Sequence, residues 1–142
     1  MVFGISEGEI DISLKTTRFY PGQEITGKVT LKLPKPKDAR ALRIAFYGEM
    51  PGTDKYRKVR RIFEVNKVLA EERTFNDKDS FDFSLTIPEN CIPASVGFYE
   101  SIMNTFSSRP NGWFVHAWLD VPLELDINKR MKIDMVPKPA GL

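Results

Sequence analysis

The sequence predicts an all-β protein, an antiparallel β-sandwich of about seven strands. Three observations support this prediction: hydrophobic and polar residues alternate over most of the chain, Pro, Gly and Asn interrupt the alternation at intervals, and a sustained helical period is almost absent. With 142 residues, 42% of them hydrophobic, the chain is long enough to bury a core without disulfides or metals. We expect one domain over residues 1–136 and a C-terminal tail over 137–142.

Two strands joined by a tight turn begin the predicted fold. Apolar or small residues occupy every second position over 10–14 and again over 25–33, with polar residues between them. The segment 20–23 places Pro21 and Gly22 where a type II turn requires a fixed φ and a positive φ. The two strands are therefore expected to run in opposite directions.

The middle of the chain continues the alternation with interruptions. The prolines in 34–38 cannot donate hydrogen bonds to a neighbouring strand, so we expect a connection there, followed by a strand over 42–46. A second Pro-Gly turn at 50–53 precedes a long, charged run over 59–69, whose length indicates a sheet edge or a β-bulge. A solvated turn at 76–79 ends this part.

Three further segments complete the predicted sandwich. Alternation resumes over 81–87 and is ended by two prolines. The segment 95–111 fits neither period, and both a strand with a long hairpin loop and a short helix remain open for it. The run 113–121 is apolar on both faces, which is typical of a central strand, and 125–135 forms the last strand.

Charge and cysteine content exclude several classes of function. Lys and Arg number 21 against 19 Asp and Glu, so a net charge of +2 does not favour nucleic acid or an anionic membrane as partner. Cys91 is the only cysteine, which excludes an internal disulfide and fits a reducing compartment. No apolar run is long enough to span a membrane, and 1–10 carries no Lys or Arg for a signal peptide. We therefore expect a cytoplasmic protein without membrane insertion.

Four segments carry a more specific pattern. They read FYPGQEITGKVTL over 19–31, ALRIAFYGE over 41–49, FDFSLTIP over 81–88 and WFVHAWLD over 113–120. Each resembles a strand of the arrestin family's N-terminal domain: an aromatic-Pro-Gly turn with a Gly-Lys-Val strand, a strand ending in Gly-Glu, a Phe-x-Phe-x-Leu strand, and an aromatic strand ending in Leu-Asp. The four resemblances occur in the family's order and cover most of the chain.

The resemblance implies an immunoglobulin-like sandwich that serves as an adaptor or scaffold, without enzymatic activity or cofactor. Such a domain binds protein partners through edge strands and loops, in trafficking or signalling. Three features depart from the family: the chain has room for one sandwich where arrestins have two, 96–109 is longer than the equivalent turn, and 1–10 has no basic residue where arrestins place a phosphate-sensing lysine pair.

The segment 55–61 is the densest chemical signal, with five basic residues in seven positions. Such a strip can bind phosphate, an acidic peptide or anionic lipid, or it can charge an edge strand against sheet association. The resemblance places 50–57 where arrestins carry a partner-contacting loop. The candidate partner-binding residues are Tyr56, Arg57, Lys58, Arg60, Arg61, Phe98 and Tyr99.

The other reactive or aromatic residues favour structural roles. Trp113 and Trp118 fall on opposite faces of their strand, so they belong to the packing and cannot form one stacking platform. His116 is the only histidine and lacks partners at a metal-ligand spacing, so no metal site is predicted. Cys91 has no neighbouring base, which indicates an inert thiol. No catalytic motif is found.

Alternatives to a hetero-partner adaptor remain. A homodimer through an edge strand would use the same backbone groups. A ligand-binding sandwich would recognise carbohydrate or an anionic small molecule through aromatics and the arginines of 55–61. A small heat-shock-type chaperone shares the length and architecture, but the segment after Ile133 lacks the Ile-x-Ile anchor.

Overall fold

The computed structural model describes residues 8–51, 59–91, 112–124 and 126–140. Every regular element in these ranges is a β-strand, seven of them with six or more residues and three shorter. Nothing in them is a helix long and apolar enough to cross a membrane. The strands are β1 Glu9–Leu14, β2 Arg18–Phe19, β3 Glu24–Lys32, β4 Lys37–Ala39, β5 Ala41–Met50, β6 Arg60–Ala70, β7 Arg73–Phe75, β8 Ser80–Thr86, β9 Gly112–Asp120 and β10 Ile127–Met135.

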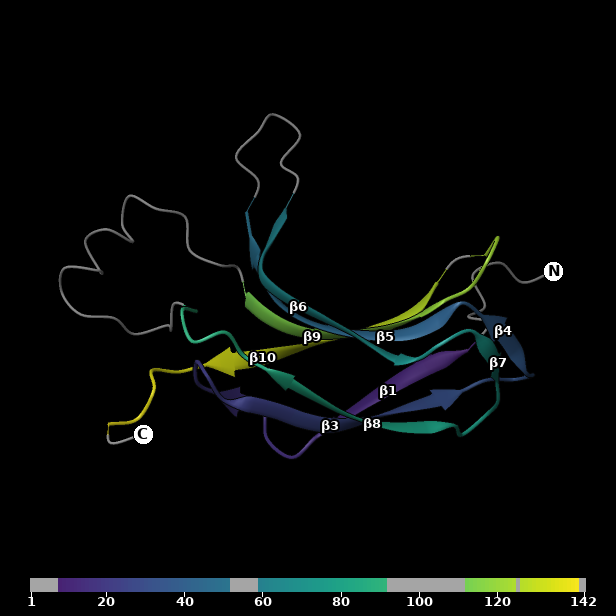
Figure 1. Ribbon diagram of the computed structural model, residues 1–142, viewed down its shortest axis with the longest axis horizontal. Helices are drawn as coiled ribbons and strands as arrows, with labels where there is room; N and C mark the ends of the chain where they lie inside the picture. The colour runs from purple at the N-terminus through teal and green to yellow at the C-terminus, as the bar shows by residue number, and fades with distance from the viewer. Residues whose placement is uncertain (1–7, 52–58, 92–111, 125, 141–142) are drawn as a thin grey trace.

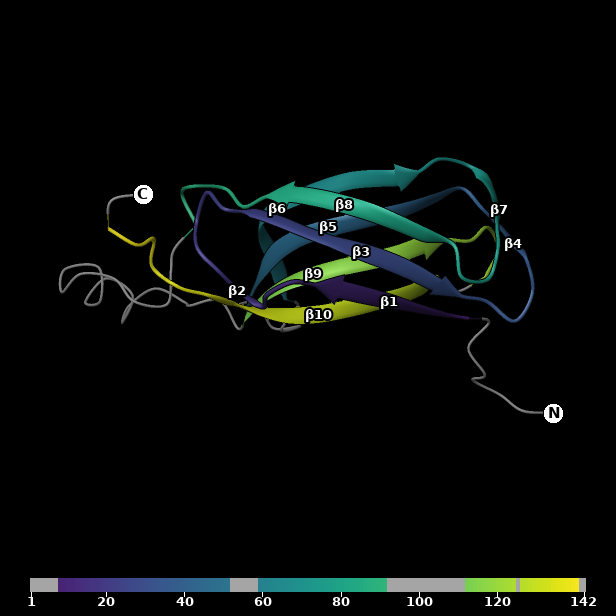
Figure 2. The ribbon, with the colours of Figure 1, turned by 90° about the horizontal axis from the view of Figure 1, so that it is seen from below.

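Two sheets pack face to face as a sandwich (Figures 1 and 2). The small sheet has the order β1-β3-β8, and the large sheet has the order β2-β10-β9-β5-β6. Neighbouring strands are antiparallel throughout both sheets except at the short parallel pair of β2 and β10. β4 and β7 form a separate pair at one end of the molecule (Figure 1). The predicted all-β sandwich is therefore confirmed, and its long strands number seven.

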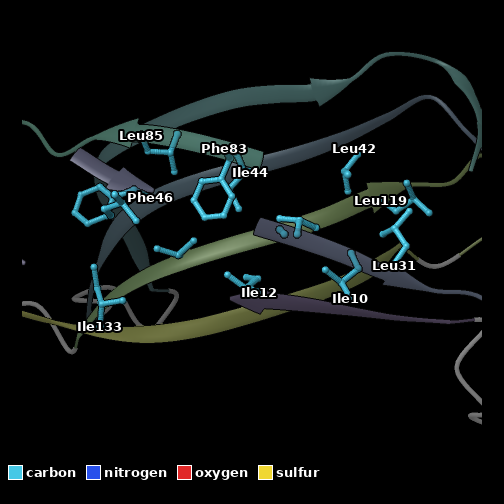
Figure 3. Packing of buried hydrophobic residues seen from close by; sticks show 14 of the residues in the cluster. Ile10, Ile12, Leu31, Leu42, Ile44, Phe46, Phe83, Leu85, Leu119 and Ile133 are labelled. Carbon is cyan, nitrogen blue, oxygen red and sulfur yellow. The ribbon is translucent and has the colours of Figure 1, made fainter. Parts of the chain in front are cut away.

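The core lies between the two sheets, because alternate side chains of each strand point inward. Figure 3 shows residues of both sheets meeting there, and each aliphatic side chain buried in this way contributes about 1.5–3 kcal/mol of transfer free energy. The labelled residues are Ile10, Ile12, Leu31, Leu42, Ile44, Phe46, Phe83, Leu85, Leu119 and Ile133.

The turn at 20–23, which joins β2 to β3, forms as its residues predict. Gly22 has a φ of +87°, and the Gln23 backbone N–H donates to the Tyr20 carbonyl oxygen over 3.1 Å. A type II turn requires this positive φ, which glycine adopts at no steric cost. The turn at 76–79 is also confirmed, with the Asp79 N–H 3.2 Å from the Asn76 carbonyl oxygen.

One prediction in the middle of the chain is wrong. The segment 34–38 was expected to be a connection throughout, yet β4 begins at Lys37, immediately after the last proline, and pairs with β7. Only the two prolines lack an N–H, so pairing becomes available once they are passed. The predicted turn at 50–53 lies partly, and the segment 95–111 entirely, outside the described residues.

β6 and β9 occupy the positions that their patterns predict. β9 lies in the middle of the large sheet, between β5 and β10, and β6 forms its edge. The β5–β6 register shifts between Phe46 and Gly48, and opposite this shift Phe63 has a φ of +53°. β6 is therefore an edge strand with a β-bulge, as the length and charge of 59–69 indicate.

Candidate interaction surface

A second group of packed side chains lies on the outer side of the large sheet. β5 and β9 are apolar on both faces, so their alternation sends one set of rings into the core and another set outward. Ala45, Tyr47 and Phe114 are buried in a cluster of their own, with Trp118 packed against them. We define the aromatic–arginine face as Tyr47, Phe114, His116 and Trp118 together with Arg61 and Arg130.

The rings of this face contact one another across β5 and β9. The Tyr47 and Phe114 ring centroids are 5.9 Å apart, and those of Tyr47 and His116 are 6.1 Å apart. His116 and Trp118, two positions apart on β9, have centroids separated by 5.1 Å. Such contacts stabilise each pair beyond the burial of its surface, so the rings hold one arrangement.

Two arginines from the flanking strands cover the two central rings. The Arg61 guanidinium carbon lies 4.2 Å from the Tyr47 ring centroid, and that of Arg130 lies 4.1 Å from the Phe114 centroid. The covered rings are only 1% and 8% exposed, although they are on the outer side of the sheet. The arginines therefore bury the rings and leave their own charged ends at the surface.

Each of these arginines also meets a carboxylate. Arg61 Nη1 donates to Glu64 Oε2 over 3.1 Å, and Arg130 Nη1 donates to Glu49 Oε2 over 2.6 Å. Hydrogen bonding to Tyr47 is the main cause that raises the pKa of Arg130 above its ordinary value, and Glu49 adds to it. The guanidinium groups are thus held by both a ring and a carboxylate.

His116 lies on the same face as the two arginines and pairs with Arg130 across β9 and β10. Its Nε2 is 3.4 Å from Asn128 Oδ1, while its Nδ1 is buried without a hydrogen-bond partner among the described residues. Burial lowers the pKa of His116, and the positive charges of Arg61 and Arg130 lower it further. The imidazole is therefore kept neutral near pH 7.

The structure describes two of the predicted partner-binding residues. Arg60 opens β6 opposite Met50 and is exposed, while Arg61, one position on, joins the aromatic–arginine face. The remaining five lie outside the described residues: Tyr56, Arg57, Lys58, Phe98 and Tyr99.

Sequence reasoning missed Tyr47 and Arg130 as members of the aromatic–arginine face. For Tyr47 a signal was present, because Ala45 and Tyr47 are apolar at the parity opposite to the core residues of 41–49. Arg130 gave no such signal, because its contacts with Phe114 and Glu49 depend on the pairing of strands distant in sequence.

The structure places Trp113 and Trp118 on opposite faces of β9, as their parity predicts, and it places Cys91 in the core. Trp113 belongs to the main core and stacks on Phe46 with centroids 5.7 Å apart, whereas Trp118 lies on the opposite face. Cys91 is buried, and burial raises the pKa of its thiol to about 11, which keeps it protonated and unreactive. Among the described residues, no three His, Cys, Asp or Glu side chains gather as metal ligands would.

The fold is that of an arrestin-like bacterial protein. The crystal structure of Spo0M, a sporulation control protein from Bacillus subtilis, matches with a TM-score of 0.70 and 20% identity, over 95% of this chain and 51% of Spo0M. The chain thus spans about half the length of Spo0M. The family model for the arrestin (or S-antigen) N-terminal domain matches residues 8–81. The chain belongs to the arrestin N-terminal domain family.

Two other comparisons add nothing to this assignment. Pseudomonas fluorescens alkylpurine DNA glycosylase AlkC, solved bound to DNA containing an abasic site analog, matches with a TM-score of 0.44 and 11% identity, over 92% of this chain and 31% of AlkC. A score this low does not establish a shared fold. A search of curated proteins finds no significant match.

Proposed function

We propose that this chain is a non-catalytic adaptor or scaffold domain that binds protein partners through strand edges and loops, in trafficking or signalling in the cytoplasm. The observation that carries the proposal is β6, an 11-residue strand at the edge of the large sheet. An edge strand offers unpaired N–H and C=O groups to a strand added by a partner. The proposed function requires no cofactor, nucleic acid or membrane insertion.

The two halves of β6 differ in how available their backbone is for pairing with a strand of a partner. In the second half, Lys67 pairs with the core residue Ile44, so its side chain points inward, and its Nζ donates to the Ser84 carbonyl oxygen of β8 over 3.0 Å. An inward-pointing charge at a sheet edge discourages further pairing. The Phe63 bulge separates this half from the first, so we expect a partner strand to bind beside Arg60.

Affinity measurements on charge variants of opposite sheets test this function. A partner captured with the chain from its own organism is purified, and its Kd is measured for the wild type, Arg60→Glu and Lys28→Glu. Arg60→Glu should weaken binding about tenfold, because it reverses a charge at the docking edge. Lys28 lies exposed on the outer side of the small sheet, so its variant is the matched control. Equal affinities for all three proteins would contradict the proposed edge.

A second copy of this chain is one candidate partner. Light scattering over a dilution series gives the mass of the wild type and of a variant with Arg57, Arg60 and Arg61 changed to Glu. A dimer that the variant dissociates would make the basic segment 55–61 a self-assembly surface. A monomer in both cases would leave the edge to a different protein.

Trp118 favours a second candidate function, the binding of carbohydrate or an anionic small molecule. It is half-buried on the outer face beside His116, so part of its indole is available for stacking. Iodide should then quench Trp118 fluorescence. A ligand should protect Trp118 from quenching and raise the Tm of the protein, and Trp118→Phe should abolish both effects of the ligand. A fully shielded Trp118 would exclude this candidate.

A further inference from the structure

The centre of the aromatic–arginine face carries more positive than negative charge. Lys132 on β10 pairs with Phe114 and lies two positions from Arg130, so it shares the outer side with Arg61 and Arg130. The two carboxylates beside them, Glu49 and Glu64, already accept hydrogen bonds from Arg130 and Arg61. A ligand that complements this surface is therefore anionic.

The guanidinium groups of Arg61 and Arg130 are preorganised for an anionic ligand. A guanidinium carries five N–H donors in a planar fork; Arg61 and Arg130 each give Nη1 to a carboxylate, and Arg130 also hydrogen bonds to Tyr47. Stacking on Tyr47 and Phe114 already restricts the Arg61 and Arg130 side chains. These two side chains therefore lose less conformational entropy when a ligand binds. Tyr, Trp and Arg are also the residue types that dominate binding energy at protein interfaces.

The spacing of the covered rings selects the form of the ligand. The Tyr47 and Phe114 centroids are 5.9 Å apart, with one guanidinium over each ring. Residues two positions apart in an extended chain point to the same side and are roughly 7 Å apart. One guanidinium lies over each of these two neighbouring rings, so an extended segment with carboxylates at alternate positions can present one carboxylate to each arginine.

We propose that the aromatic–arginine face docks an extended acidic segment of a partner protein, with carboxylates at alternate positions bound to Arg61 and Arg130. This inference rests on the proposed function, since it names the chemistry of a partner of the same adaptor domain. It differs in the surface used: the segment lies on the outer face of the large sheet, whereas the edge of β6 receives a strand beside Arg60.

Two other occupants fit the face less well. A second copy related by a two-fold axis would bring arginines against arginines at the centre of the contact. Single-stranded nucleic acid requires exposed rings on which bases stack, yet Tyr47 and Phe114 are only 1% and 8% exposed. An acidic peptide needs only the guanidinium edges.

Four labelled probes test this inference on the full chain by fluorescence anisotropy. They are an octapeptide of alternating Glu and Thr, its Gln–Thr counterpart, a block peptide of repeating Glu-Glu-Thr-Thr in which no two Glu are two positions apart, and an eight-nucleotide oligothymidine. Thr favours the extended form, so the alternating peptide presents its carboxylates on one side. It should bind at least about tenfold tighter than the Gln–Thr peptide and detectably tighter than the block peptide.

Variants assign this binding to the face. Arg61→Gln and Arg130→Gln should each weaken binding of the alternating peptide about five- to tenfold, and Lys132→Gln should weaken it less. Lys28→Gln on the small sheet should leave it unchanged, and near-ultraviolet circular dichroism checks that each variant keeps the native packing. Undetectable binding, equal binding of the Gln–Thr peptide, an equal loss in Lys28→Gln, or tighter binding of oligothymidine would overturn the inference. If the inference fails in this way, the proposed function is tested separately. Weaker binding of the captured partner to Arg60→Glu would still support the edge of β6 as a docking site.

Discussion

The two outer faces of the sandwich lie on opposite sides of one core, and their side chains differ in kind. On the small sheet, Ser13, Lys28 and Asp82 form a row of exposed polar side chains across the three strands. On the large sheet, Tyr47 and Phe114 occupy paired outward positions and are buried under arginines. A sandwich needs an apolar inner face only, and the small sheet shows that a polar outer face suffices. The rings of the large sheet therefore form a second buried cluster, outside the core that both sheets share.

The largest expected effect is a difference in unfolding free energy between substitutions on the inner and the outer face of β9. Trp113→Ala should lower the free energy of unfolding by about 3–5 kcal/mol, because it removes a buried ring stacked on Phe46. Trp118→Ala should cost about 1 kcal/mol, because its indole is half-buried on the outer face. Urea unfolding with tryptophan fluorescence measures both values.

Phe substitutions at the same two positions are the matched controls. Trp113→Phe keeps a ring against Phe46 and should recover most of the loss, whereas Trp118→Phe should be close to the wild type. Equal losses in the two alanine variants would mean that the outer cluster is as much a part of the core as Trp113 is. The distinction between the two faces would then fail.

An intermediate effect compares one cation on each outer face. Arg130→Gln removes a guanidinium 4.1 Å from the Phe114 centroid and its hydrogen bond to Glu49, and it should lower the free energy of unfolding by about 1 kcal/mol. Lys28→Gln on the small sheet should stay within about 0.5 kcal/mol of the wild type. Equal effects would show that the arginines of the large sheet act as ordinary surface charges.

Local pattern predicted much of this architecture. Apolar residues at both parities of 113–121 predicted the central position of β9, because a strand with neighbours on both sides of a sandwich sheet can bury both faces. The same parity placed Trp113 and Trp118 on opposite faces. The Pro21-Gly22 pair predicted the turn between β2 and β3, because few other residues satisfy its backbone angles.

What could not be predicted depends on contacts between distant segments. β4 and β7 have three residues each, which is too few to show a period. The cover that Arg130 gives Phe114 follows from the register of β10 against β9, which pairs Arg130 with His116. A cluster of charge such as 55–61 is visible in the sequence, whereas an arginine that lies over a ring is visible only once strands are paired.

The smallest expected effect is the pH dependence that His116 gives to the aromatic–arginine face. Burial and the charges of Arg61 and Arg130 lower its pKa in the folded state, so between this value and the unfolded value of 6.5 the unfolded chain binds more protons. Stability should therefore be complete above about pH 6.5 and decline as the pH falls through the folded pKa. Chemical unfolding from pH 7.5 to 5.5 measures the decline, and His116→Gln should flatten it, because the chain has a single histidine. Parallel profiles for the two proteins would show that the imidazole is solvated as freely as the side chains of the small sheet.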